Sequence, residues 1–319
     1  MPLSAQITRI NLQDISADRS WSLHPFLPLQ PSANLLNSIK TIGILHPPIL
    51  LKSEQNKYKI LSGQFRISTL EHCDSHPELQ ISAHILSKNT AASTLLHVIF
   101  SDQRVNGKLS PMEEAYFYQL CLRHMRLEEF SIWYVSISDK TLSKYVIEQT
   151  LSLLTLETEL QKAVHRGNIS VKLATDLLKL NARDRTALFK LFHYLQLGGK
   201  KQKRLLSLCT DFAAKEGREI KDILDEAEVI EIIDHPATNL PQKFASLTGY
   251  LYKRLFPASS RTEEEFNRRV QRMDLPRSCH ILHSPAFEQD TVSLSLSFSG
   301  LDELEKNTSK ILVLMEKNH

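Results

Sequence analysis

Three residues near position 64 have the types and spacing of an anion-binding site. Gly63, Gln64 and Arg66 lie where an alternating apolar segment gives way to a helical pattern. A helix start carries unpaired backbone N–H groups and a partial positive charge, and glycine lets a ligand approach the backbone closely. Arginine adds a cation that can donate two parallel hydrogen bonds. The spacing predicts a phosphate site, with a plain helix start as the alternative.

The segment before Gly63 predicts the elements that position these residues. Apolar residues within 35–42 recur at three- and four-residue spacing, which predicts a helix closed by a left-handed cap at Gly43. Two prolines then exclude helix, and the apolar run 49–51 predicts a buried strand. A polar turn and an alternating strand over 58–62 follow. We therefore expect a hairpin that leads into the helix start.

This segment resembles the N-terminal domain of ParB partition proteins and the related sulfiredoxin-like fold. The family combines S-I, a glycine, a proline and a G-E/Q-R-R box, matched here by Ser38-Ile39, Gly43, Pro47 and Gly63-Gln64-Phe65-Arg66. The resemblance implies CTP, with Mg²⁺, bound at Gly63, Gln64 and Arg66. It also expects arginine at two positions that are Phe65 and Ser68 here. Sulfiredoxin chemistry needs a nucleophilic cysteine in this loop. Because the matching residue is Gln64, we do not expect this catalysis.

A second stretch resembles the family pattern E-N-x-Q-R followed by L-x-P-x-E-E-A. Gln103 and Arg104 match the first part, which implies nucleotide contacts, and 109–115 matches the second. Ser-Pro-x-Glu within it is a capping box that predicts a helix start. The family's Glu-Asn pair, which helps to place Mg²⁺, is Phe100-Ser101 here. We expect CTP hydrolysis to be weak or absent. Asp102 could supply a compensating carboxylate, although its adjacent position should point it elsewhere.

The middle of the chain is basic. Between Asp139 and Leu206 lie 13 lysines and arginines and 6 acidic residues, an excess of seven positive charges, whereas the whole chain carries +3. Such a segment indicates a polyanion-binding module, and a solvated helical surface is the alternative. Residues 141–156 resemble the second helix of a ParB-type helix-turn-helix, and 158–178 resemble the family segment that follows. The resemblance implies binding of double-stranded DNA.

The expected DNA contacts come from helix starts in this basic region. Periodicity over 141–156 predicts a buried stripe of Val146 or Ile147 with Thr150, Leu151, Leu154 and Leu156, and an outward-facing first turn. Another predicted helix start follows Gly198-Gly199 and carries four cations. The expected DNA-binding residues are Ser143, Lys144, Tyr145, Gln149, Lys172, Lys200, Lys201, Lys203 and Arg204.

The C-terminal segment predicts a strand followed by a helix. Residues 291–299 alternate apolar side chains with serine, which is typical of a half-buried strand, and 301–316 carry a matching apolar stripe. This pair needs either a strand at 279–282 or a second copy of itself. It resembles the ParB dimerisation element, which implies a homodimer. Thr262 and Glu265 predict a further capping box.

Length and composition indicate a globular protein of several domains. The chain has 319 residues, 42% of them apolar and 24% charged. Four scattered cysteines form no C-x-x-C, and the His/Cys groups at 72–76 and 279–283 lack zinc-finger spacing, so we predict no protein metal centre. No membrane span or signal-peptide layout is found. We expect a cytoplasmic, nucleoid-associated protein.

Together these patterns predict an α+β protein. The expected domains are a ParB/sulfiredoxin-like nucleotide-binding domain at 1–109, an all-helical helix-turn-helix domain at 110–215, a linker with short helices at 216–260 and a small α/β dimerisation domain at 261–319. The predicted function is sequence-specific DNA binding in chromosome or plasmid partition, switched by CTP and coupled to a ParA-type ATPase.

Two other functions fit parts of the pattern. A ParB-like transcriptional regulator would bind DNA without nucleotide dependence. An enzyme on the N-terminal fold, such as a small-molecule kinase or a nuclease, would need a carboxylate base and metal ligands, for which Glu71, Asp74 and Asp102 are the nearby candidates. DNA binding is the predicted primary role.

Overall fold

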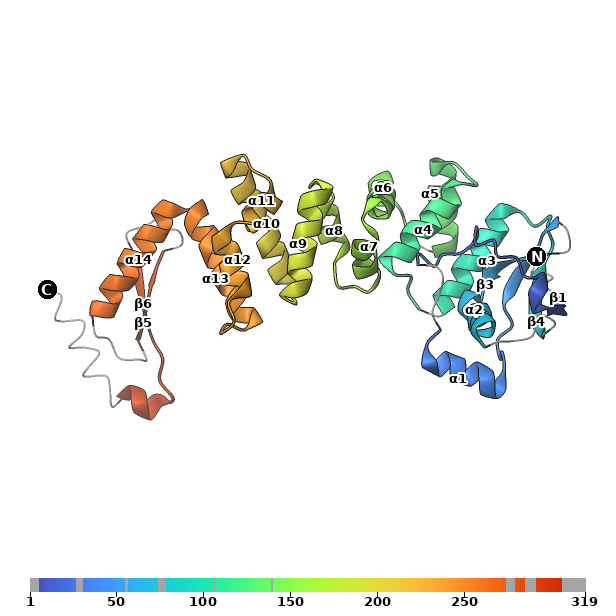
Figure 1. The fold of residues 1–319 in the computed structure, drawn as a ribbon, viewed down its shortest axis with the longest axis horizontal. Coiled ribbons are helices and arrows are strands. Elements are labelled where there is room, and N and C mark those ends of the chain that lie inside the picture. The colour runs from blue at the N-terminus through green and yellow to red at the C-terminus, as the bar shows by residue number, and fades with distance from the viewer. Residues whose placement is uncertain are drawn as a thin grey trace. The chain divides into compact units, whose positions relative to one another are not determined.

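The computed structural model of the chain describes residues 6–26, 31–54, 57–73, 79–105, 107–138, 140–273, 279–284 and 291–305. They belong to two units, of which the first comprises Met1–Phe189 with Gly198–Lys200 and the second Lys190–Leu197 with Lys201–His319. The first unit holds a sheet and a series of helices. The second holds further helices and a β-hairpin (Figure 1).

A mixed four-stranded sheet organises the start of the first unit (Figure 1). β4 pairs antiparallel with β1 and parallel with β2, and β2 and β3 form the predicted antiparallel hairpin. In spatial order the strands are β1 (Gln6–Asn11), β4 (Gln80–Leu86), β2 (Ile49–Lys52) and β3 (Tyr58–Ser62). The sequence-based prediction of this hairpin is confirmed.

One face of the sheet packs against two helices that flank the hairpin in sequence. Leu50 and Ile60 are buried on this face together with residues of α1 (Ala33–Ile42) and α2 (Gln64–His72). Gly43 ends α1 with φ 84°, as predicted, but its ψ of −163° lies outside the left-handed helical region expected for it. The helix therefore stops at the glycine through a different backbone conformation.

The opposite face of the sheet shares its core with the helices that follow. Leu51 and Leu61 lie in one buried cluster with Phe117, Phe130 and Ile147, because successive side chains on a strand point to opposite faces. The helices that contribute are α3 (Ala92–Val105), α4 (Pro111–Leu122), α5 (Leu127–Ser138) and α6 (Lys144–Ser152). The sheet and these helices are thus joined by one core.

Capping interactions fix the start of α4 and the packing of the later helices. The Ser110 hydroxyl accepts the Glu113 N–H, and the Glu113 carboxylate accepts the Ser110 N–H, which confirms the predicted capping box. Further along, Arg185 donates to both carboxylate oxygens of Glu157 at 2.7 and 2.8 Å. These residues connect the start of α7 to α9; the bounds are α7 (Thr158–His165), α8 (Val171–Leu177) and α9 (Ala182–Tyr194).

The second unit is built from packed helices. Its core helices are α10 (Gly199–Glu216), α11 (Ile220–Leu224), α12 (Ala227–Asp234) and α13 (Leu240–Leu255), so the range 216–260 is largely helical. Glu226 accepts hydrogen bonds from Arg218, Tyr250 and Arg254, which links three segments. None of the described helices is long and apolar enough to cross a membrane.

The end of the described chain departs from one expectation. α14 (Pro257–Arg272) begins at Pro257, and the Thr262 hydroxyl bonds to the Ala258 carbonyl inside the helix, so the predicted capping box is wrong. Proline at the first helical position is the start signal here.

The predicted C-terminal strand is present, and its apolar side chains are exposed in the described part of the chain. β6 (Val292–Leu296) pairs with β5 (Cys279–His283), the first of the two partners considered. Val292 and Leu294 are 62% and 49% exposed in the described part of this single chain, so burial of the strand by a second copy stays a prediction. Of the helix expected over 301–316, residues 301–305 are helical and the remainder lies outside the described residues.

Candidate functional site

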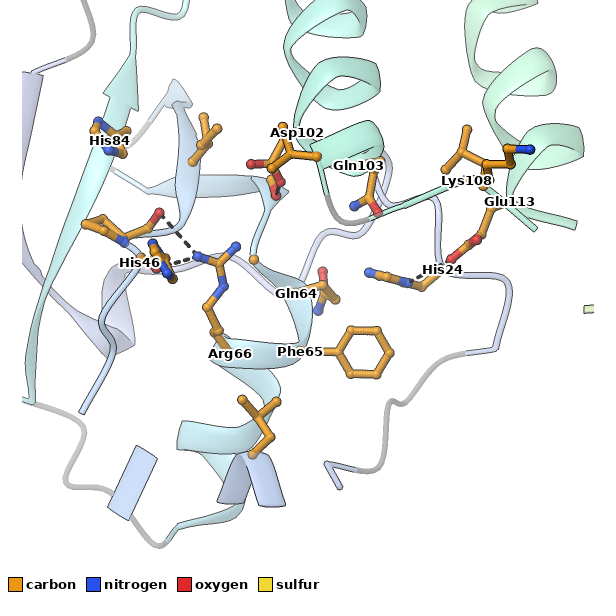
Figure 2. A pocket seen from close by; sticks show the side chains of 17 residues that line it. His24, His46, Gln64, Phe65, Arg66, His84, Asp102, Gln103, Lys108 and Glu113 are labelled. Atoms are coloured by element: carbon orange, nitrogen blue, oxygen red, sulfur yellow. Dashed lines mark hydrogen bonds and ion pairs between the residues drawn. The ribbon is translucent and has the colours of Figure 1, made fainter. Parts of the chain in front are cut away.

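A cavity of about 720 Å³ opens where the β2–β3 hairpin meets α2 (Figure 2). β3 ends at Ser62, and Gly63 turns the chain into α2 with φ 92° and ψ 18°. A Cβ atom at Gly63 would lie 2.7 Å from the Cβ of Pro48. Glycine is therefore needed at this turn both for its backbone conformation and for the space beside Pro48.

Gln64 lines this cavity and carries a buried side-chain oxygen without a partner among the described residues. Its side chain lines the cavity although the residue is only 5% exposed. Within the described part of the chain, its Oε1 atom has no hydrogen-bond partner. A buried polar oxygen without a partner costs free energy, so this position favours a ligand donor or a cation.

Arg66 places a cation against the cavity wall. Its Nη1 atom donates to the carbonyl of His46 and lies 3.5 Å from the carbonyl of Pro47 (Figure 2). Burial lowers the pKa of Arg66, and the nearby carboxylate of Asp102 opposes that shift. The guanidinium nevertheless stays charged at neutral pH. The bonds to main-chain carbonyls hold it beside the helix start.

Asp102 is a cavity residue, contrary to the expectation that its side chain points elsewhere. Its side chain lines the cavity (Figure 2). The carboxylate accepts a hydrogen bond from the hydroxyl of Ser62, which immediately precedes Gly63. Phe100 instead enters the core, where it is 4% exposed. Residues two apart on a helix point to opposite sides, so burying Phe100 turns Asp102 toward the cavity.

The structure brings together four of the five expected nucleotide-binding residues. Gly63, Gln64, Arg66 and Gln103 line the cavity. Arg104 is not among its lining residues, and its guanidinium lies 5.6 Å from the ring centroid of Phe100. Arg104 thus packs beside Phe100, four residues earlier on α3, and not in the cavity lining.

Several cavity residues were missed by the sequence-based reasoning. They include three histidines and a lysine from separate segments: His24, His46, His84 and Lys108. No local motif marks them, because they are assembled by the fold. The burial of His24 lowers its pKa, which the carboxylate of Glu113, 3.9 Å from Nδ1, partly opposes.

Two positions where the resemblance expects arginine offer no cation. Phe65 lies at the cavity and is 40% exposed, whereas Ser68 is buried in α2 and does not line the cavity. Among the described lining residues, Arg66 and Lys108 are therefore the permanent cations.

The first turn of α6 is exposed, as predicted. Ser143 caps the helix by accepting the Val146 N–H, Lys144 pairs with Glu148 at 3.7 Å, and Tyr145 is 70% exposed. These side chains are positioned to reach a groove or a phosphate backbone.

The buried side of α6 differs in detail from the prediction. Ile147, Thr150 and Leu153 are buried, whereas Leu154 is only partly buried. Gln149 is also partly buried, and its amide donates to the Thr175 hydroxyl of α8 at 3.4 Å. Gln149 thus helps to hold α6 against α8.

The remaining expected DNA contacts lie on two other helices. Lys172 is exposed in the first turn of α8. The expected residues on α10 are also exposed, namely Lys200, Lys201, Lys203 and Arg204. The Lys201 amine lies 5.4 Å from the ring centroid of Phe244, and the Lys201 side chain is exposed to solvent.

Comparison with known proteins identifies the helical region. The family model described as ParB HTH domain matches residues 107–207. A probable chromosome-partitioning protein ParB of Borreliella burgdorferi is 29% identical over 177 residues, which cover 54% of this chain and 62% of that protein. The chain thus spans about three fifths of the length of this relative.

Two solved ParB structures from Caulobacter crescentus, both truncated at the C-terminus, also match. The one complexed with CTP-gamma-S has 18% identity and a TM-score of 0.24, and covers 56% of this chain and 94% of its own. The one complexed to the centromeric parS site has 17% identity and a TM-score of 0.33, and the match covers 63% of this chain and 98% of that chain. The chain thus carries a region, residues 107–207, that matches the ParB HTH domain, and it is similar to a curated ParB protein.

Proposed function

We propose that this protein binds a specific double-stranded DNA sequence and acts in chromosome or plasmid partition. The observation that carries the proposal is the ParB HTH match, within which the first turn of α6 exposes Lys144 and Tyr145. A recognition helix reads the major groove with its N-terminal residues, and nearby cations such as Lys172 bind phosphates. DNA recognition through α6 follows from this arrangement.

Selection from a pool of random DNA duplexes tests the DNA-binding proposal. The wild-type chain should enrich one sequence, and Tyr145→Ala should reduce the preference for it over a scrambled duplex. Lys203→Ala, on α10, should weaken binding to both duplexes by a similar factor, because a phosphate contact carries no sequence information. A pool with no enriched sequence after repeated rounds contradicts the proposal.

We also propose that the cavity binds CTP and that the nucleotide switches DNA binding. A helix start at Gly63 and the guanidinium of Arg66 suit a phosphorylated ligand. The resemblance to ParB names CTP as that ligand. Hydrolysis should be weak, since Phe100 and Ser101 stand where the family carries Glu and Asn.

Calorimetry of the full chain with CTP and ATP in the presence of Mg²⁺ tests this second proposal. CTP should bind more tightly than ATP, and Arg66→Ala should abolish the heat of binding. Arg123→Ala is the matched control, because Arg123 is an exposed arginine at the end of α4 and does not line the cavity. An absence of binding by either nucleotide to the folded wild-type chain contradicts it.

We further propose that the protein forms a homodimer and acts together with a ParA-type ATPase. The exposed apolar side chains of Val292 and Leu294 supply a surface that a second copy can cover. Sedimentation equilibrium should show a dimer for the wild-type chain and a monomer for the double variant Val292→Ser, Leu294→Ser. An equally stable dimer in that variant would show that the β5–β6 hairpin is not part of the dimer interface.

A further inference from the structure

Phe65 places an apolar ring in the first turn of α2, where the cavity would receive a phosphate chain. The ring lines the cavity, and it meets the ring of His24 edge-on with the centroids 4.6 Å apart. Burial lowers the pKa of His24 below its usual value of 6.5, so His24 is neutral at pH 8. Phe65 and His24 thus form an uncharged wall beside the helix start (Figure 2).

Among the described lining residues, Arg66 is the permanent cation at this helix start. Its Nη1 atom already donates to the main-chain carbonyl of His46, and the carboxylate of Asp102 lies close enough to act on the pKa of Arg66. Lys108 enters the cavity from the segment before α4, apart from Arg66 (Figure 2). The positive charge of Arg66 is therefore offset locally by Asp102.

The permanently charged side chains of the whole cavity also balance. Among the described lining residues, Arg66 and Lys108 are positive, and Asp102 and Glu113 are negative. Each added phosphate brings further negative charge, and moving a charge out of water costs free energy unless a partner compensates it. The helix start and Arg66 compensate the first charges of a phosphate chain. A terminal phosphate meets the ring of Phe65 where a third cation would be needed.

We infer that Phe65 makes this cavity indifferent to the terminal phosphate, so that it binds the nucleoside diphosphate at least as tightly as the triphosphate. The inference rests on the proposed CTP binding and deepens it by naming the length of the phosphate chain that the cavity selects. A nucleotide switch with this property responds to CDP as well as to CTP.

Phe65→Arg tests the role of the ring, because it adds a guanidinium at a position that is 40% exposed in the first turn of α2. A charge-assisted hydrogen bond to the terminal phosphate should shift the ratio of the two affinities toward CTP by about tenfold. The matched control is Ser101→Arg, which adds the same charge at an exposed position on α3 outside the cavity lining. Phe65→Leu removes the ring without adding charge and should keep the wild-type ratio.

Asp102→Asn tests the charge balance independently of Phe65. The new amide keeps an oxygen that can accept the hydroxyl of Ser62, and the substitution removes the negative charge near Arg66. It should shift the affinity ratio toward CTP by at least about threefold. Tryptophan fluorescence verifies that each variant is folded.

Calorimetry at pH 8 and a fixed Mg²⁺ concentration measures the dissociation constants of CTP and CDP for the wild-type chain and the four variants. Wild type should bind CDP more tightly than CTP, or equally within about threefold. A larger wild-type preference for CTP overturns the inference. So does a Phe65→Arg variant whose ratio equals that of Ser101→Arg.

The outcomes also separate this inference from the proposed CTP binding. If Arg66→Ala abolishes CTP binding and the wild type favours CTP over CDP by more than about threefold, CTP binding stands and the role of Phe65 fails. If the folded wild-type chain binds neither nucleotide, the CTP proposal and the inference fail together.

Discussion

The ring of Phe65 meets the ring of His24 edge-on, with their centroids 4.6 Å apart. His24 also lies 3.9 Å from the carboxylate of Glu113, which caps α4 through Ser110. The hydroxyl of Ser110 in turn lies 2.8 Å from Nδ1 of His165, at the end of α7. A continuous row of contacts therefore joins the cavity to the helix-turn-helix region.

The first prediction concerns the pH dependence of stability. Burial lowers the pKa of His24, so the unfolded chain takes up its proton more readily than the folded chain. Stability should therefore fall as the pH drops below about 6.5, the ordinary histidine value. His24→Gln should flatten this decline.

Urea unfolding followed by tryptophan fluorescence between pH 7.5 and pH 5 measures the effect. Trp21 and Trp133 are the two tryptophans of the chain, and both belong to the first unit. His97→Gln, at an exposed position on α3, is the control. A His24→Gln variant with the same pH slope as the wild type would show that His24 is not the titrating group.

The second prediction compares two glycines with positive φ. Gly63→Ala brings Cβ to within 2.7 Å of Pro48, whereas a Cβ at Gly43 meets no atom within 4 Å. Gly43→Ala should cost about 1–3 kcal/mol of unfolding free energy from backbone strain alone, because its φ of 84° and ψ of −163° lie in a region that is essentially restricted to glycine. Gly63→Ala should cost more and should also weaken CTP binding. Equal losses in urea unfolding would show that the space beside Pro48 is unimportant.

The third prediction concerns the ion pair between Arg185 and Glu157. Both carboxylate oxygens accept from the guanidinium, whose side chain is 10% exposed, and the Leu180 carbonyl accepts from Nη1. Arg185→Met should reduce the unfolding free energy by about 2 kcal/mol, because it leaves a partly buried carboxylate unpaired. Lys179→Met is the control, since Lys179 pairs with Asp176 at the surface.

The same pair has a pH signature. The hydrogen bonds from Arg185 lower the pKa of Glu157 below its usual value of 4.5. Its contribution to stability should be complete above about pH 4.5 and disappear as the pH falls below that value. Wild type and Arg185→Met should therefore converge in stability in acid. A constant difference down to pH 3 would contradict the assignment.

Local sequence signals predicted the hairpin, the Gly63 turn and the capping box at Ser110 because each depends on neighbouring residues. The orientation of α3 was not predictable in this way. Whether Phe100 or Asp102 faces the cavity depends on which side of α3 packs against the sheet, and that is decided by the shared core. His24 lies far from Phe65 in sequence, so no spacing rule could place them together.

The fourth prediction concerns the ionic part of DNA binding. Lys144 and Lys172 are exposed in the first turns of α6 and α8. If each contacts a phosphate, Lys→Ala at either position should lower the slope of log affinity against log salt by about one. Arg123→Ala on the exposed end of α4 is the control for general loss of charge. Fluorescence anisotropy over a salt series measures the slopes, and slopes unchanged in both lysine variants would place the phosphate contacts elsewhere.

The most direct test of the central claim is the affinity of the full chain for its selected duplex and for a scrambled duplex, measured by fluorescence anisotropy at fixed salt. A ParB-type reader of DNA sequence should bind the selected duplex about 10³-fold or more tightly than the scrambled one. CTP with Mg²⁺ should change the affinity for the selected duplex in the wild type and not in Arg66→Ala. Equal affinity for both duplexes would contradict sequence-specific recognition, and an unchanged affinity on addition of CTP would contradict the nucleotide switch.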